Sequence, residues 1–133
     1  MTASASHPFL RRALLLDAAA SGLTGALMIG GAGLLQDLLA LPVGLLRGAG
    51  LILVPYVAFV VMVASRTPIS VGAVWAVIVC NGLWAVASVA IVVDGVVAPN
   101  MLGAAFVIGQ GLAVAALGLL QYVALGRPQS SLA

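Results

Sequence analysis

Four long stretches of this 133-residue chain contain no charged side chain. They cover residues 18–35, 48–65, 67–93 and 95–126. A helix needs about 20 apolar residues to cross the roughly 30 Å of hydrocarbon in a bilayer. Each stretch is close to that length or longer. The chain is therefore predicted to be an all-α integral membrane protein, a bundle of four transmembrane helices.

The composition supports lipid as the solvent of this chain. Hydrophobic residues make up 64% of it and charged residues 6%, whereas a soluble domain carries about 25% charged residues. Such a chain cannot form the charged surface that a water-soluble domain needs. We expect an N-terminal arm over residues 1–12, a transmembrane domain over 13–127 and a C-terminal tail over 128–133. The predicted spans are about 13–35, 46–65, 70–93 and 101–125.

The arginines predict the orientation of the bundle. If four helices alternate in direction, Arg11, Arg12, Arg66 and Arg127 all lie on one side of the membrane. Loops on the cytoplasmic side carry an excess of Arg and Lys. Both termini, including the arm, are therefore predicted to be cytoplasmic, with Arg47 as the one Arg near the outer side.

Several function classes have no support in the residues present. The longest basic run is Arg11-Arg12, too short for a nucleic-acid-binding surface. His7 is the single histidine, so a His-based metal site, haem ligation or a catalytic triad cannot be built from one chain. We therefore predict a protein that is not an enzyme, binds no nucleic acid, and requires no cofactor or metal.

Polar side chains inside the spans are the candidate functional residues, because a polar group in hydrocarbon is costly unless it has a partner. Counting depth along alternating helices places Thr24, Tyr56, Asn81 and Gln110 near the membrane midplane, one from each span. Gln121 shares a face of the fourth span with Gln110. This predicted polar cluster is either a set of interhelical hydrogen bonds, worth about 0.6 kcal/mol each, or a polar substrate site.

Asp17 is the most suggestive single residue. The predicted spans place it about one turn inside the cytoplasmic edge, at a depth near Gln121 and within reach of Arg66 or Arg127. Burial disfavours the charged form of a carboxyl group, and this is how acidic residues serve in proton coupling. Asp17 is therefore a candidate residue for proton or ion coupling. The alternative is a structural role, in which an ion pair fixes the helix position.

Small residues four apart mark faces on which helices can approach closely. Ser21 and Gly25 form one such pair, and Gly111 and Ala115 form another. Gly44 and Gly48 form a third pair. The sequence leaves open whether these faces meet within one chain or between two chains.

Three segments carry a resemblance to known proteins: residues 47–56 (RGAGLILVPY), residues 81–88 (NGLWAVAS), and residues 103–107 (GAAFV) followed by Gln110 and Gln121-Tyr122. Together they resemble a group of functionally uncharacterised four-span inner-membrane proteins of proteobacteria. The resemblance implies a multi-pass protein of the bacterial inner membrane and supplies no activity.

An acid early in the first of four short spans is also similar to the small multidrug resistance transporters, which pair two chains around such acids. The acid here is Asp17 rather than Glu, and aromatic residues make up only 5% of the chain.

Two functions are consistent with these observations. The first is a non-enzymatic accessory or interaction protein that joins a heteromeric membrane complex. The alternative is a small proton-coupled transporter that works as a homodimer, with Asp17 as the coupling carboxylate.

Overall fold

The computed structural model of the chain describes residues 7–127, and five helices make up this part. They are α1 (Pro8–Gly30), α2 (Ala32–Leu39), α3 (Val43–Ser65), α4 (Val71–Val93) and α5 (Met101–Leu125). All except α2 are long and apolar enough to cross a membrane. The predicted all-α bundle with four helices of membrane-spanning length is confirmed.

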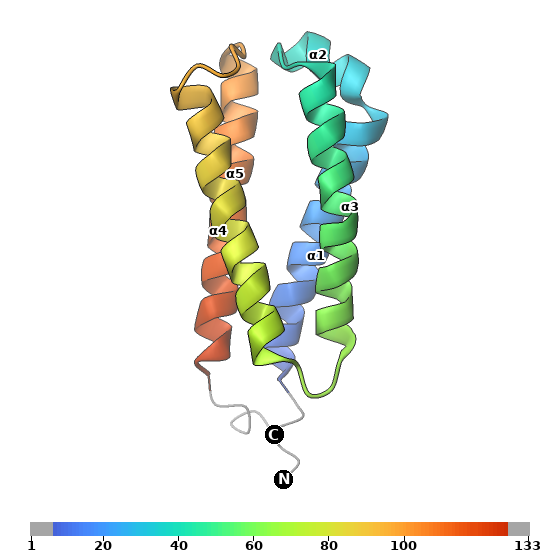
Figure 1. Cartoon of the computed structure of the whole chain (residues 1–133), viewed down its shortest axis with the longest axis vertical. Helices are drawn as coiled ribbons and strands as arrows, with labels where there is room; N and C mark the ends of the chain where they lie inside the picture. Colours follow the sequence, from blue (N-terminus) through green and yellow to red (C-terminus); the bar gives the residue numbers. More distant parts are fainter. Residues whose placement is uncertain (1–6, 128–133) are drawn as a thin grey trace.

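The four long helices form two pairs that stand side by side (Figure 1). Helix α1 packs along α3, and α4 packs along α5, whereas α3 and α4 touch only briefly. The start of α1, the α3–α4 connection and the end of α5 lie at one end of the bundle, which we call the Arg end after Arg11, Arg66 and Arg127. Helix α2 and the α4–α5 connection lie at the opposite end.

The first span differs from its predicted bounds of 13–35. Helix α1 begins five residues earlier, with Pro8 at its first position, where the fixed φ of proline suits a helix start. It ends at Gly30 because Gly31 leaves helical geometry, with φ −106° and ψ 16°, and a separate helix α2 follows. Residues 8–12 of the predicted arm are therefore helical. Residues 1–6 of that arm and the tail 128–133 lie outside the described residues.

The other spans agree with the predicted bounds to within three residues. Helix α3 begins at Val43 rather than residue 46, α4 begins at Val71 rather than residue 70, and α5 matches 101–125. The side chain of Ser70 caps α4 by accepting a hydrogen bond from the amide of Ala73.

Asn100 begins α5 and also fastens it to α2. Its side-chain oxygen accepts a hydrogen bond from the Gly103 amide at 2.8 Å. Its side-chain nitrogen donates to the carbonyl of Leu38 at 2.9 Å, and its backbone amide donates to the carbonyl of Leu39 at 3.2 Å. One residue thus caps α5 and joins it to α2 at the end opposite the Arg end.

Glycine allows each pair to pack closely. A Cβ atom added to Gly50 of α3 would lie 3.0 Å from the carbonyl oxygen of Gly25 in α1. One added to Gly111 of α5 would lie 2.9 Å from Cβ of Ser88 in α4. Two of the predicted small-residue faces, those of Gly25 and Gly111, therefore meet within the chain. Gly44 and Gly48 have no such neighbour within 4 Å.

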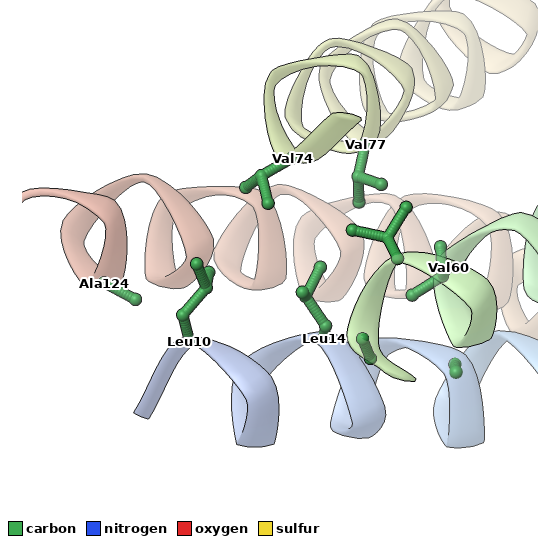
Figure 2. Close-up of a cluster of buried hydrophobic side chains, with 9 residues drawn as sticks. Leu10, Leu14, Val60, Val74, Val77 and Ala124 are labelled. Carbon is green, nitrogen blue, oxygen red and sulfur yellow. The ribbon is translucent and has the colours of Figure 1, made fainter. Parts of the chain in front are cut away.

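Two apolar clusters fill the interior. The cluster near the Arg end draws on all four long helices (Figure 2) and consists of Leu10, Leu14, Ala18, Val60, Val63, Ala64, Val74, Val77 and Ala124. The other lies toward α2 and consists of Met28, Ala32, Leu35, Leu39, Leu41, Leu46, Leu53 and Val107. Tyr56 packs against both clusters and therefore lies between them along the bundle.

We expect Gly111→Ala to destabilise the bundle by about 1–3 kcal/mol, because the added methyl group forces α4 and α5 apart at Ser88. Gly109→Ala is the matched control in the same helix, since nothing lies within 4 Å of a Cβ atom added there. Reversible unfolding in mixed micelles measures both variants. Equal stability of the two variants would contradict the close α4–α5 approach.

Candidate functional site: a buried polar cluster

A carboxyl group lies at the centre of the bundle and is hydrogen-bonded to four side chains. Asp17 is 0% exposed. Its Oδ2 atom accepts from the Tyr56 hydroxyl at 2.7 Å, from Asn81 Nδ2 at 3.0 Å and from Gln121 Nε2 at 2.7 Å. Its Oδ1 atom accepts from the Ser21 hydroxyl at 3.0 Å. We call these five residues the Asp17 cluster; every long helix contributes to it.

Further contacts close the cluster into a network. Asn81 Nδ2 also donates to Gln121 Oε1 at 3.0 Å, which joins α4 to α5. The Tyr56 hydroxyl also lies 2.8 Å from Asn81 Oδ1, which joins α3 to α4. Asn81 is 2% exposed and Gln121 is 0% exposed. The network therefore ties the α1–α3 pair to the α4–α5 pair inside the bundle.

The positions of Asp17, Tyr56 and Asn81 along their helices explain why these three residues meet. Asp17 lies nine residues after the start of α1, Tyr56 nine residues before the end of α3, and Asn81 ten residues after the start of α4. All three distances are counted from the Arg end, so the side chains reach a common level at about 1.5 Å per residue. Ser21 lies one turn after Asp17 and shares its face.

Gly118 of α5 makes room for Asn81. A Cβ atom at position 118 would lie 3.2 Å from Cβ of Asn81, which is tighter than ordinary van der Waals contact. Gln121 follows one turn later on the same face of α5. The small residue thus brings the amide of Asn81 within hydrogen-bonding distance of the amide of Gln121.

A second polar group lies farther from the Arg end and involves only α4 and α5. Trp84 Nε1 donates to Gln110 Oε1 at 2.9 Å, and Gln110 Nε2 donates to the Ser88 hydroxyl at 2.8 Å. The Ser88 hydroxyl donates in turn to the carbonyl of Trp84. This group holds one helix pair together and does not reach α1 or α3 through these bonds.

Of the five residues of the predicted polar cluster, Thr24, Tyr56, Asn81, Gln110 and Gln121, the structure brings three together and places Thr24 and Gln110 apart from them. The Thr24 hydroxyl donates to the carbonyl of Ala20 in its own helix at 2.8 Å, and this satisfies it locally. Gln110 lies eleven residues before Gln121, about 16 Å along α5. It belongs to the second group. Tyr56, Asn81 and Gln121 are brought together around Asp17.

The predicted surroundings of Asp17 also need correction. Because α1 begins at Pro8, Asp17 lies more than two turns into the helix rather than one. Neither predicted Arg partner contacts it. The carbonyl of Arg66 accepts from Arg11, and the guanidinium of Arg127 lies 4.5 Å from the ring centre of Phe9. All four donors to Asp17 are neutral side chains.

Two contacts were missed by sequence reasoning. Ser21 is predicted only as a small residue of a helix–helix face, although a hydroxyl one turn from a buried acid is a signal for this hydrogen bond. Arg11 had been assigned only to topology. Its guanidinium donates to the carbonyls of Ala64 and Arg66 and to the Thr67 hydroxyl, at the end of α3. No sequence pattern indicated that partner.

A small cavity lies between the Asp17 cluster and the second polar group. Its volume is about 60 Å³. It is lined mainly by apolar atoms. Ser21 of the Asp17 cluster and Trp84 and Gln110 of the second polar group also line it. The remaining lining residues are Ala20, Thr24, Leu53, Ala113, Val114 and Leu117. Sites for drug-sized ligands measure about 300–1,000 Å³. This cavity has room for a few water molecules and not for an organic substrate.

The chemistry available to the Asp17 cluster is hydrogen bonding and proton exchange. Within residues 7–127, no buried side-chain nitrogen or oxygen lacks a hydrogen-bond partner. In the same residues, no three His, Cys, Asp or Glu side chains come together as a metal site would require. Asp17 is the one acidic side chain of the cluster, and Tyr56 is its one other titratable group.

We expect Gln121→Leu to lower the free energy of unfolding by about 1–3 kcal/mol, because it removes a donor to Asp17 and an acceptor for Asn81. Thr24→Val should change it by less than about 0.5 kcal/mol, because its hydroxyl bonds only to its own helix. Unfolding in mixed micelles compares the two. A larger loss in the Thr24 variant would contradict the assignment of the cluster.

No protein-family model, curated protein or solved structure matches this chain.

Proposed function

We propose that this chain is a non-enzymatic accessory protein of the bacterial inner membrane that works by binding another membrane-embedded chain. The observation that carries the proposal is the closed interior: the buried polar atoms of the described residues bond to one another. The cavity beside the Asp17 cluster, of about 60 Å³, is too small for a substrate. The lipid-facing surface is then the part of the bundle available to other molecules.

A groove on the α1–α3 pair is the part of that surface best suited to a helix of another chain. Its volume is about 360 Å³. Four small residues of α1 and four larger apolar residues line it: Ser21, Gly22, Gly25, Ala26, Ile29, Leu53, Val54 and Val57. Without a hydrophobic driving force between helices in lipid, association depends on close packing over small residues. A transmembrane helix with bulky side chains fits this shape.

Gentle extraction from native membranes, followed by mass determination of the intact assembly, tests the proposal. We expect a stoichiometric complex with a different protein. Ala26→Leu, which places a bulky side chain in the groove, should reduce recovery of that partner by tenfold or more. Ala115→Leu is the matched control on exposed α5 surface and should leave recovery unchanged. A chain that is extracted alone, or only with copies of itself, would contradict the proposal.

The orientation gives a separate prediction. We propose that both termini face the cytoplasm, because the Arg end carries Arg11, Arg12, Arg66 and Arg127. A C-terminal fluorescent-protein fusion should fluoresce, and a C-terminal fusion to a periplasmic alkaline phosphatase should be inactive. The reverse pattern would place the Arg end outside.

A proton-coupled transporter acting as a homodimer is the second candidate. It is favoured by Asp17, an acid in the middle of the bundle that bonds to side chains of every long helix. A constraint on this candidate is that Asp17 is 0% exposed within its own chain. A substrate or a second copy can reach the carboxyl only if the two helix pairs separate.

Flux measurements on vesicles containing the purified chain test this second candidate. We expect Asp17→Asn to abolish pH-dependent flux, and Asp37→Asn, at an exposed acid, to leave it intact. Unchanged flux in the Asp17 variant would assign Asp17 a structural role.

A further inference from the structure

The Asp17 cluster contains six short polar contacts, and its neutral donors place hydrogens in only five of them. Six contacts of 2.7–3.0 Å join its five residues. Three of them converge on Asp17 Oδ2, and a fourth reaches Oδ1. The remaining two join Asn81 to Tyr56 and to Gln121. Each contact requires one hydrogen between its two atoms.

With an ionised Asp17, hydrogens fill only five of the six contacts. Ser21 supplies one and Gln121 supplies one to Asp17, and the two hydrogens of Asn81 Nδ2 go to Asp17 and Gln121. Tyr56 has a single hydroxyl hydrogen but lies against two acceptors. If it donates to Asp17, its oxygen faces Asn81 Oδ1 at 2.8 Å with no hydrogen between them.

One additional hydrogen, on Asp17 Oδ2, fills the sixth contact. The carboxyl then donates to the Tyr56 oxygen, and the Tyr56 hydroxyl donates to Asn81 Oδ1. Oδ2 still accepts from Asn81 and Gln121. We infer that Asp17, Tyr56 and Asn81 form a proton-binding site. Asp17 holds a proton and donates a hydrogen bond to Tyr56, which donates in turn to Asn81.

Among residues 7–127, the side chains bonded to Asp17 are all neutral. Helix α3 presents Tyr56, and α5 presents the amide of Gln121. Cys80, next to Asn81 in α4, is exposed. Tyr122 of α5 is exposed and packs its ring against Trp75. Of the two Arg residues of α1, Arg12 is exposed and Arg11 bonds to the end of α3. A buried carboxylate without a cation is costly, whereas a protonated carboxyl is neutral.

The bound proton has a structural consequence. Asp17 and Tyr56 belong to the α1–α3 pair, and Asn81 belongs to the α4–α5 pair. Without the proton, the Tyr56 hydroxyl donates to Asp17 instead of Asn81. The Tyr56 oxygen and Asn81 Oδ1 then face each other with no hydrogen between them. The proton thus maintains one of the bonds between the two pairs. This inference concerns the interior of the bundle and does not depend on the proposed accessory function.

Infrared spectroscopy of the full chain in lipid vesicles tests the inference, because a protonated carboxyl has a C=O band distinct from those of a carboxylate. The chain has only three acidic side chains, and the other two, Asp37 and Asp94, are exposed. At neutral pH we expect a protonated-carboxyl band that shifts in heavy water. Asp17→Asn should abolish it, and Asp37→Asn and Asp94→Asn should retain it.

Tyr56→Phe provides a second measurement that does not require the Asp17 variant to fold. The band should move to a different frequency, because the proton loses its acceptor. Absence of the band in the unmodified chain at neutral pH would overturn the inference. So would a band that Asp37→Asn or Asp94→Asn abolishes, or a band unmoved by Tyr56→Phe.

Discussion

A carboxyl group buried in an apolar bundle constrains everything around it. Asp17 is completely enclosed, and hydrocarbon offers no water to solvate it. An unpartnered polar group there costs several kcal/mol, so each neighbouring helix has to present a hydrogen-bonding side chain at the same level. Tyr56, Asn81 and Gln121 meet this requirement. The level and rotation of all four long helices are tied to that one side chain.

The division into two helix pairs follows from where the small residues lie. Gly25 and Gly50 bring α1 and α3 into close contact, and Gly111 and Gly118 do the same for α4 and α5. Each pair is therefore held by close packing of its two helices over small residues. Between the pairs, both apolar clusters and the polar contacts of the Asp17 cluster make the connection. Directional bonds specify an arrangement that apolar packing in lipid specifies less strictly.

The sequence was sufficient for the number of helices and for most of their bounds, because a charge-free stretch of about 20 residues has few alternatives in a bilayer. It was insufficient at the first span. Pro8 and Gly31 shifted that helix toward the N-terminus, and this placed Asp17 deeper than expected. Conversely, the agreement in α5 follows from a clear start, where Asn100 caps the helix.

The site was predictable in part. Counting depth brought Tyr56 and Asn81 together and put Asp17 level with Gln121. It put Gln110, rather than Gln121, at the level of Tyr56 and Asn81, because depth alone does not show which amide of a helix face reaches a given partner. It also assigned Thr24 to the interior, although a threonine in a helix can bond to the preceding turn and need no partner elsewhere. Depth is readable from sequence, whereas the choice among neighbouring partners depends on tertiary contacts.

Asn100 has a consequence for the axial register of the last helix. By holding the carbonyls of Leu38 and Leu39, it fixes the height at which α5 begins. Gln121 follows 21 residues later, about 32 Å along the axis. A slip of one residue at Asn100 would turn Gln121 by about 100° and move it about 1.5 Å. The contact of Asn100 with the short helix α2, at one end of the bundle, therefore determines whether Gln121 can form its hydrogen bond with Asp17 near the other end.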